Sequence, residues 1–333
     1  MKQYLDIVKN IINNGQFKQP TRTVHGITNT VNSTIGTFCE IFRHDMSSGF
    51  PLLTCRKMPI RSILIELEGF IKGITSKEWY IQRGCHYWDF WCNPVAAQEF
   101  YQKNYSQLKR DSKGRFSGIN DRPSFESIKK DIQQSVDDLG PVYGYQWRRF
   151  GQQYGEVPTY EVDEYDNVLF EQVNGVHQGV DQLQSIVNQL KTNPYDRRMV
   201  CSAWNPNQEY LMALPPCHVL WHVTVFNDKL NLVWFQRSND ILIGNPSNIA
   251  SYATLLLLLA KTANLTPGEL VGVWSDAHIY TNQLDQAKLL VEREPRELPQ
   301  LEILTNDIFE WDHTKVRLTN YNPHEKIKFE LTV

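Results

Sequence analysis

The sequence predicts an α+β fold in which a largely antiparallel or mixed sheet packs against helices. Two observations carry this prediction. Segments with helical periodicity and segments with strand-like alternation are both present, and they do not alternate in the βαβ rhythm of a doubly wound fold. With 333 residues and 41% hydrophobic content, the chain can bury a large core. We expect one domain over residues 1–333, with the more polar segment 92–137 as an inserted surface subdomain.

Each expected element rests on its own pattern. In the first helix, Ile63, Leu67, Phe70 and Ile71 recur at helical spacing on one face, and a later helix stops at Pro194. The segments expected to be helical are 60–74, 179–194, 248–265 and 282–294. The segments expected to be strands are 218–238, with a turn at 226–229, then 314–321 and 327–333.

Composition excludes several classes of function. A net charge of -3 and a pI near 6.3 give no basic field for nucleic acid. The apolar run 248–265 carries Asn, Ser, Tyr, Thr and Lys, which favours a buried helix over a membrane span. The first residues lack the apolar core of a signal peptide, and six cysteines without paired spacing indicate reduced thiols. We therefore expect a cytoplasmic protein without membrane or nucleic-acid partners.

Cys217, in the stretch LPPCHVLWH, has three interpretations. It is a small buried hydrophobe, a metal ligand with His218 and His222, or a nucleophile. In a regular strand 218 and 222 share a face and 217 points away, so the metal site is disfavoured and no metal is expected. A nucleophile needs a cation nearby, which Arg237 supplies if its strand lies alongside. The residues alone leave these interpretations open.

Seven motifs, in order along the chain, resemble the thymidylate synthase family, which includes the pyrimidine nucleotide hydroxymethylases. They are DLGPVYGYQWR, NPYDRRMVCSAWNP, ALPPCHVL, FQRSND, GNPSNIASYA, SDAHIYTNQLDQ and REPRELPQL. The likeness runs from Arg22 to the C-terminus apart from 92–137, which resembles an insertion of some bacterial synthases. It implies a homodimer with back-to-back sheets. It also implies dUMP as substrate and 5,10-methylenetetrahydrofolate as co-substrate.

The resemblance also implies site residues. Cys217 matches the nucleophile that adds to C6 of the pyrimidine, Asn248 the base reader and Asp240 the pterin ligand. The other matches, group by group, are these: Arg22, Arg237 and Ser238 for the phosphate, with Arg197 and Arg198 reaching it from the other subunit; His278 and Tyr280 for the sugar 3′-hydroxyl; Glu66, Tyr143 and His218 for the proton network; and Trp88, Trp91, Gly244, Ser247 and Val333 for the folate side.

The residue types suit this chemistry. Arginines bind phosphate through forked donors, and their charge favours a thiolate. An amide at position 248 can donate to O4 and accept from N3–H, which suits uracil, whereas a carboxylate would suit cytosine. Without the motifs, Glu66 would be interpreted as a residue at the edge of an apolar helix face. Residues 196–198 would be interpreted as a solvent-exposed turn. Trp88 and Trp91 then read as core, and His222, where the family commonly has Gln, as structural.

Departures from the family fall on the folate side. Gly69 replaces a usual aromatic residue, Ser247 replaces Phe, Ser275 replaces Gly, and the tail 327–333 differs, though Val333 is kept. An open folate face would let water trap the exocyclic methylene at C5. We therefore expect a deoxyuridylate hydroxymethylase, an enzyme that phages with modified DNA bases produce. Thymidylate synthase is the alternative, and a non-catalytic paralogue that binds nucleotide or RNA is the minor one.

Overall fold

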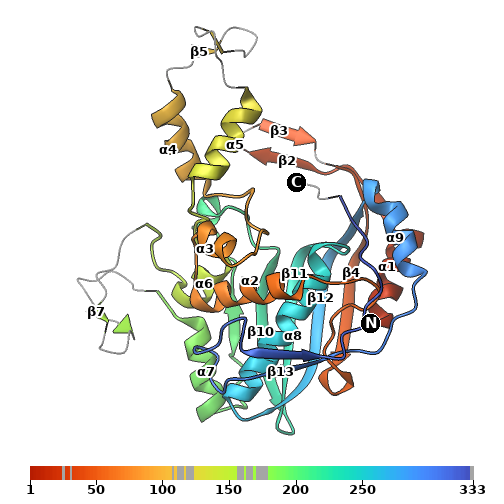
Figure 1. Cartoon of the computed structure of the whole chain (residues 1–333). Helices are drawn as coiled ribbons and strands as arrows, with labels where there is room; N and C mark the ends of the chain where they lie inside the picture. The colour runs from red at the N-terminus through yellow and green to blue at the C-terminus, as the bar shows by residue number, and fades with distance from the viewer. Residues whose placement is uncertain are drawn as a thin grey trace. The chain divides into compact units, whose positions relative to one another are not determined.

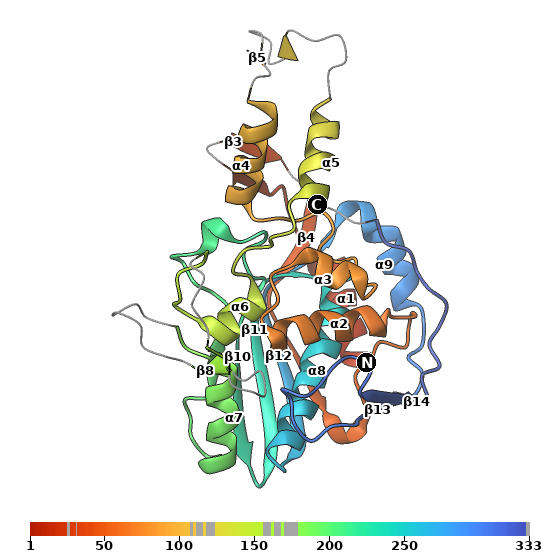
Figure 2. The same cartoon turned by 60° about the vertical axis from the view of Figure 1, so that its left-hand side comes forward.

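A computed structural model of the chain provides the structure, drawn in two views (Figure 1 and Figure 2). It describes residues 1–24, 27–30, 32–106, 109–110, 116–117, 124–155, 161–162, 168–169 and 179–330. Within these ranges, the side chains of 21–24, 27–30, 109–110, 116–117, 125, 161–162 and 168–169 lie outside the description.

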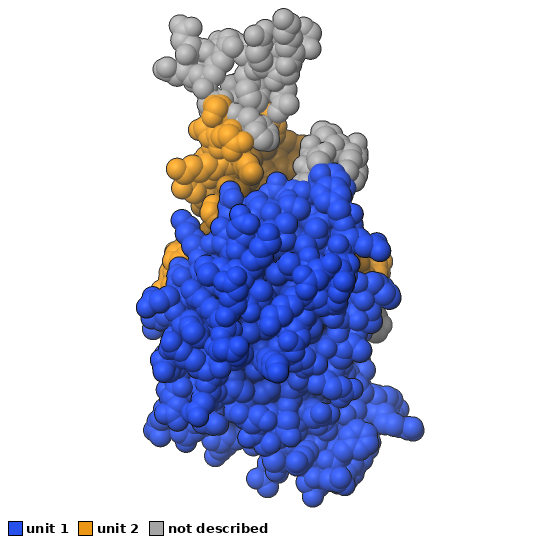
Figure 3. Space-filling model, turned by 90° about the vertical axis from the view of Figure 1, so that its right-hand side faces the viewer, with its two compact units in different colours: residues 1–68, 183–202, 217–333 blue, residues 69–182, 203–216 orange. Residues whose placement is uncertain are grey.

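The chain divides into two compact units (Figure 3). Unit 1 consists of 1–68, 183–202 and 217–333, and unit 2 consists of 69–182 and 203–216. Each unit is described by itself below. Most of the residues singled out by the sequence belong to unit 1.

Unit 1 is built around a six-stranded sheet with the order β1-β4-β12-β11-β10-β9. The strands are β1 (Gln16–Lys18), β4 (Thr34–Asp45), β9 (Val200–Ser202), β10 (His218–Phe226), β11 (Lys229–Asp240) and β12 (Thr266–Tyr280). The β11–β12 pair is parallel and the other four pairings are antiparallel. The sheet is therefore mixed, and the predicted α+β class is confirmed.

The two strands predicted over 218–238 form the β10–β11 hairpin. Asn227 and Asp228, in its turn, have φ angles of 50° and 58°. Two successive left-handed residues are typical of the tight turn that matches the twist of a hairpin, and Asn and Asp tolerate this conformation. The short turn fixes the register, so the residues before β10 lie opposite the end of β11.

Helices cover one face of this sheet. Figure 1 and Figure 2 show α8 (Gly244–Thr262) along β11 and β12, and the Tyr252 ring of α8 stacks on Trp234 with centroids 5.0 Å apart. The other helices that reach into unit 1 are α1 (Lys2–Asn14), α2 (Ile60–Lys72), α7 (Gln182–Thr192) and α9 (Leu284–Val291). The four predicted helices are thus confirmed. No helix of the described residues is long and apolar enough to cross a membrane.

The opposite face of the sheet is apolar and partly exposed. Ile41, Val200 and Phe226 have exposed fractions of 48%, 44% and 67%. Val233 and Val271, which pair with each other across β11 and β12, are half-buried on the same face. This face contrasts with the helix-covered one, where Trp234 and Trp274 are fully buried.

The C-terminal segment of unit 1 departs from prediction. Residues 314–321 contain strand β14 (Val316–Thr319), which pairs with β13 (Gln300–Ile303), as expected. The strand predicted from residue 327 is wrong for 327–330, which are irregular. Contacts with side chains of other segments, rather than pairing with another strand, hold this segment. Gln283 Nε2 donates to Glu330 O at 2.7 Å, and the Arg56 guanidinium lies 5.0 Å from the Phe329 ring centroid.

Unit 2 is mainly helical. Its helices are α3 (Lys77–Gln82), α4 (Pro94–Tyr105), α5 (Phe125–Ser135) and α6 (Tyr143–Arg149). Side chains cap three of them at the N-terminus: Ser76 accepts from Trp79 N, Asn93 from Val95 N, and Ser124 from Ser127 N. The segment 92–137 contains α4 and α5. The remaining short strands of the chain pair as hairpins: β2 (Thr21–Val24) with β3 (Ile27–Thr30), β5 (Lys109–Arg110) with β6 (Phe116–Ser117), and β7 (Glu161–Val162) with β8 (Val168–Leu169).

Candidate active site

Cys217 directly precedes β10, where its main chain pairs with the end of β11. Arg237 N donates to Cys217 O at 2.9 Å. The proline that precedes the cysteine, Pro216, is buried. The expectation that the strand of Arg237 lies alongside Cys217 is confirmed, so the hairpin brings the nucleophile candidate and a cation into one neighbourhood.

The exposure of Cys217 separates it from most other cysteines of the chain. Cys55, Cys85 and Cys201 are fully buried, whereas Cys217 is half-buried. Burial raises the pKa of the Cys55 thiol and, similarly, that of Cys92. A raised pKa lowers the thiolate fraction, which is the reactive form. The accessible thiol beside Arg237 is therefore better placed for nucleophilic chemistry than these four.

His218 is held in a buried, neutral state. Its Nδ1 lies 2.7 Å from the Tyr252 hydroxyl, and the two rings meet edge to face with centroids 5.3 Å apart. Burial lowers the pKa of His218 to about 3. The imidazole is therefore uncharged at neutral pH, and the hydroxyl of α8 fixes its orientation.

The expectation that 218 and 222 share a strand face is wrong. The register shifts between His218 and Leu220, so His218 pairs with Gln236 while His222 pairs with Val233. Because positions 233 and 236 are an odd number of residues apart, they lie on opposite faces of the sheet. The two histidines diverge, and no group of three metal-binding side chains is present among the described residues.

Asn248 is oriented by a residue to which the sequence analysis gave no role. Its Nδ2 donates to Gln236 Oε1 at 3.2 Å. Gln236, 2% exposed, also accepts from Trp234 Nε1 at 3.3 Å and donates to Ser238 O at 3.1 Å. Gln236 therefore links the predicted base reader to the strand that carries Arg237 and Ser238.

Asp240 closes the turn between β11 and α8. Its Oδ1 accepts from Leu242 N and Ile243 N, both at 3.0 Å. Burial raises the pKa of its carboxyl, while these backbone donors and the nearby Arg56 and His278 side chains act in the opposite direction. At Gly244, no described atom lies within 4 Å of the place a Cβ would take, so the start of α8 has open space beside it.

The end of β12 brings His278 and Tyr280 together. Their rings meet edge to face with centroids 5.4 Å apart. Asp276 lies beside them, 3.3 Å from His278 Nδ1 and 2.6 Å from Lys18 Nζ. The hydrogen bond from His278, followed by that from Lys18, lowers the pKa of Asp276 to about 2. His278, one of the pair predicted to contact the sugar, is thus bonded to a carboxylate that stays ionised.

The arginine pair stands apart from these groups. Arg197 and Arg198 lie in the loop between α7 and β9, both exposed. The Arg198 guanidinium, 90% exposed, bonds to Asp196, and this contact lowers the pKa of the Asp196 carboxyl. The side chain of Arg22 and all of Val333 lie outside the described residues.

In unit 2, two predicted site residues belong to one aromatic cluster. Trp88, 4% exposed, meets Tyr143 edge to face with centroids 6.1 Å apart. Tyr143 stacks on Phe70 of α2 at 4.9 Å, and Trp91 N donates to Trp88 O at 3.0 Å. Glu66 is half-buried on α2, in the part of that helix that belongs to unit 1.

The position of Gly69 is not a void. A Cβ there would overlap the Tyr80 hydroxyl oxygen and two carbons of its ring. Tyr80 is 1% exposed and comes from α3. The aromatic ring that the sequence lacks at position 69 is thus supplied by a residue eleven positions later, a compensation with no local sequence signal.

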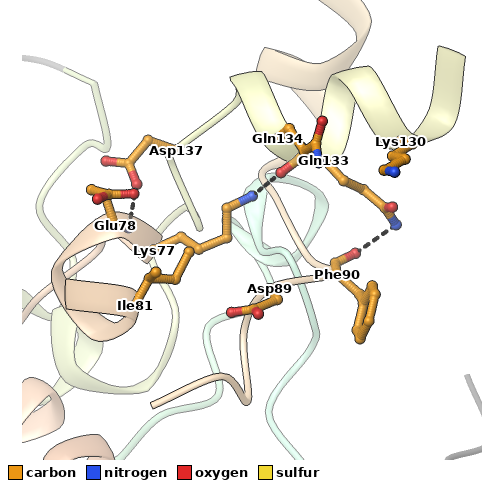
Figure 4. Close-up of a pocket in the computed structure, with 9 residues that line it drawn as sticks. All are labelled: Lys77, Glu78, Ile81, Asp89, Phe90, Lys130, Gln133, Gln134 and Asp137. Atoms are coloured by element: carbon orange, nitrogen blue, oxygen red, sulfur yellow. Dashed lines mark hydrogen bonds between the residues drawn. The ribbon is translucent and has the colours of Figure 1, made fainter. Parts of the chain in front are cut away.

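A separate hollow lies in unit 2 and contains none of the predicted site residues (Figure 4). Its volume is about 590 Å³, and α3, α5 and the loop at 89–90 line it. The buried Lys77 ammonium donates to the carbonyls of Gln133 and Trp91 rather than standing free in the hollow. Its lining mixes carboxylates and lysines, which defines no single ligand chemistry.

Comparison with known proteins identifies the family. The family model described as "Thymidylate synthase" matches residues 2–333. A thymidylate synthase of Mycoplasma pneumoniae (strain ATCC 29342 / M129 / Subtype 1) is 36% identical over 337 residues, which cover 100% of each chain. The fold is that of an α+β enzyme with a mixed sheet, and the chain belongs to the thymidylate synthase family. It is accordingly a one-carbon transferase.

Proposed function

We propose that this protein is a thymidylate synthase, which converts dUMP and methylenetetrahydrofolate into dTMP and dihydrofolate. The observation that carries the proposal is the Tyr80 ring beside Gly69, because it fills the space that the missing aromatic side chain at position 69 was expected to leave open. The tail supports the same conclusion, since Gln283 and Arg56 bind it up to Glu330. The full-length relative is also named a thymidylate synthase.

In this proposal Cys217 begins the reaction. Its thiolate adds to C6 of the uracil ring, which turns C5 into an enolate carbon able to attack a one-carbon unit. Arg237, paired with Cys217, favours the thiolate and binds the nucleotide phosphate together with Ser238. The neutral His218 holds a hydrogen bond at the site without carrying charge. The result is a covalent adduct between Cys217 and the nucleotide, which Arg237 and Ser238 of the neighbouring strand orient.

Asn248 reads the base. Gln236 Oε1 accepts from Asn248 Nδ2, an amide nitrogen with two hydrogens. The second hydrogen is then available to O4 of uracil, and Asn248 Oδ1 can accept from N3–H. Cytosine presents the reverse pattern at these two atoms, so the arrangement favours a uridine nucleotide.

In unit 1, the residues proposed for the folate side are Asp240 and Gly244. Space is open beside Gly244, and the Asp240 carboxyl binds the backbone of the turn that leads to it. When bound, methylenetetrahydrofolate supplies the carbon and, in the synthase reaction, the hydride that completes the methyl group. The residues of this chain orient it and keep water from the reacting carbon.

The proposed assembly is a homodimer. The open sheet face, with exposed Ile41, Val200 and Phe226, has the apolar character of a subunit interface core. Arg197 and Arg198 are exposed, which suits the proposed role at another subunit's phosphate site. Both features support back-to-back sheets with shared sites.

Hydroxymethylation of dUMP is the second candidate, in which water adds to the exocyclic methylene and tetrahydrofolate leaves unoxidised. The segment 239–247 favours it. Asn239 and Asn245 are fully buried, and their side-chain amides have no hydrogen-bond partner among the described residues. Ser247, also buried, lies two residues after Asn245. Buried polar groups of this kind are where ordered water binds.

Product analysis decides between the two. The purified protein is incubated with dUMP and methylenetetrahydrofolate, and the nucleotide is identified by mass spectrometry while dihydrofolate is followed by absorbance. Stoichiometric dTMP and dihydrofolate support the synthase. A hydroxymethylated nucleotide without dihydrofolate overturns it in favour of the second candidate, and Ser247→Phe should then restore some dTMP. Cys217→Ser, which keeps the phosphate ligands, is the inactive control.

A further inference from the structure

Four residues of unit 2 form a continuous aromatic arrangement that ends beside Gly69. Phe70 stacks on Tyr143 at 4.9 Å, Tyr143 meets Trp88 at 6.1 Å, and Trp88 meets Tyr80 at 6.5 Å. The Tyr80 ring also lies against Gly69, the residue that precedes Phe70 in α2. All four rings are buried.

This arrangement requires a glycine at position 69. Glycine is among the least favourable residues inside a helix, so a glycine in the middle of α2 needs a reason. Its φ is not in the left-handed region, so the backbone does not require it. The reason is contact: any side chain at 69 would occupy the volume of the Tyr80 ring.

Tyr80 contacts Trp88, one of the three predicted functional residues of unit 2. Trp88 lies between Tyr80 and Tyr143, and both neighbours constrain its ring. Tyr80 is further held by Trp79, which meets it edge to face at 5.1 Å. A ring packed on two sides has little rotational freedom, because interiors are close-packed.

We infer that Tyr80 is a positioning residue that sets the orientation of Trp88 and, through it, of Tyr143. This inference rests on the proposed function, in which Trp88 contributes to the folate side. In this role Tyr80 acts through its packing on Gly69 and Trp88. Methylenetetrahydrofolate use therefore depends on the Tyr80 ring, whereas dUMP binding does not.

The test is a double-mutant cycle in the full chain. Gly69→Ala alone should raise the KM for methylenetetrahydrofolate and lower the melting temperature, because the new methyl group displaces the Tyr80 ring. In a Tyr80→Leu background the same Gly69→Ala change should be neutral or stabilising, since alanine favours the helix. Melting temperatures that add across the cycle would overturn the inference, whatever the reaction product is.

Kinetics provide the second readout. Tyr80→Leu should raise the KM for methylenetetrahydrofolate about threefold to tenfold, the range expected for loss of an aromatic pair, and leave the dUMP KM within about twofold. Tyr80→Phe, which keeps the ring, should stay close to the wild type. Tyr101→Leu, an aromatic change of unit 2 outside the arrangement, is the matched control. Equal changes in both KM values would indicate general destabilisation and refute positioning.

The failures of the two proposals are distinguishable. A wild type that makes no dTMP removes the synthase function and leaves the stability cycle intact. Additive melting temperatures remove the role of Tyr80 and leave the product unchanged.

Discussion

Replacing Tyr252 by Phe removes one hydrogen bond and retains the surrounding packing. The lost bond is the 2.7 Å contact between the hydroxyl and His218 Nδ1, while the stack on Trp234 at 5.0 Å depends on the ring and survives. His218 is 7% exposed, so its nitrogen cannot turn to bulk water. A buried polar atom that loses a hydrogen-bond partner costs about 1–3 kcal/mol, so the free energy of unfolding should fall by about this amount.

The assay is urea unfolding, followed by tryptophan fluorescence, with the midpoint and slope fitted for each variant. The matched control is Tyr210→Phe, because Tyr210 is 66% exposed and its hydroxyl reaches water. That variant should stay within about 0.5 kcal/mol of the wild type. The kcat of Tyr252→Phe should also fall, since the His218 ring loses the contact that sets its orientation.

Equal stabilities of Tyr252→Phe and Tyr210→Phe would refute the reasoning. Such a result would mean that His218 has another partner in solution or that its site admits water. A loss of kcat without loss of stability would instead locate the hydroxyl in the reaction itself.

Three further predictions concern the site and its pH dependence. Asn248→Asp should shift preference from dUMP toward dCMP, because a protonated carboxyl matches N3 and the amino group of cytosine; a competition assay with both nucleotides measures it, and unchanged selectivity would remove Asn248 as base reader. Mixing Cys217→Ser with Arg198→Ala subunits should restore activity at one hybrid site per dimer; mixtures no more active than either parent, after confirmed subunit exchange, would contradict a shared site. Stability should fall as the pH drops from about 6.5 toward about 3, because the unfolded state protonates His218 there while the folded state, with a His218 pKa of about 3, does not. Urea midpoints measured across this range for the wild type and His218→Asn would show it, and identical slopes would count against a buried neutral imidazole.

Local sequence patterns predicted much of the fold. The helices at 60–74 and 248–265 and the hairpin over 218–238 follow from apolar spacing and one turn, and the structure contains all of them. Motif likeness carried the family, because several short stretches in a fixed order are specific even when each is weak. The placement of Arg237 beside Cys217 also followed from strand pairing.

The rest depended on contacts that no local pattern records. A register shift of β10 sends His218 and His222 to opposite faces, and alternation counted along the sequence misses a bulge. Gly69 looked like a missing ring because the ring that replaces it, Tyr80, comes from another helix. The segment 327–330 alternates like a strand but finds side-chain partners instead of a ladder.

The hydrogen bonds of Gln236 determine which atom of the Asn248 amide acts as donor and which as acceptor. A side-chain amide can be turned over with almost no change of shape, which would exchange donor and acceptor. The indole of Trp234 removes this freedom, because Nε1–H only donates and so demands the oxygen of Gln236. That oxygen in turn demands the nitrogen of Asn248, which leaves Oδ1 of Asn248 pointing elsewhere. If Asn248 reads the base as proposed, the polarity with which it meets a pyrimidine is set from the core, by a tryptophan with no exposed surface.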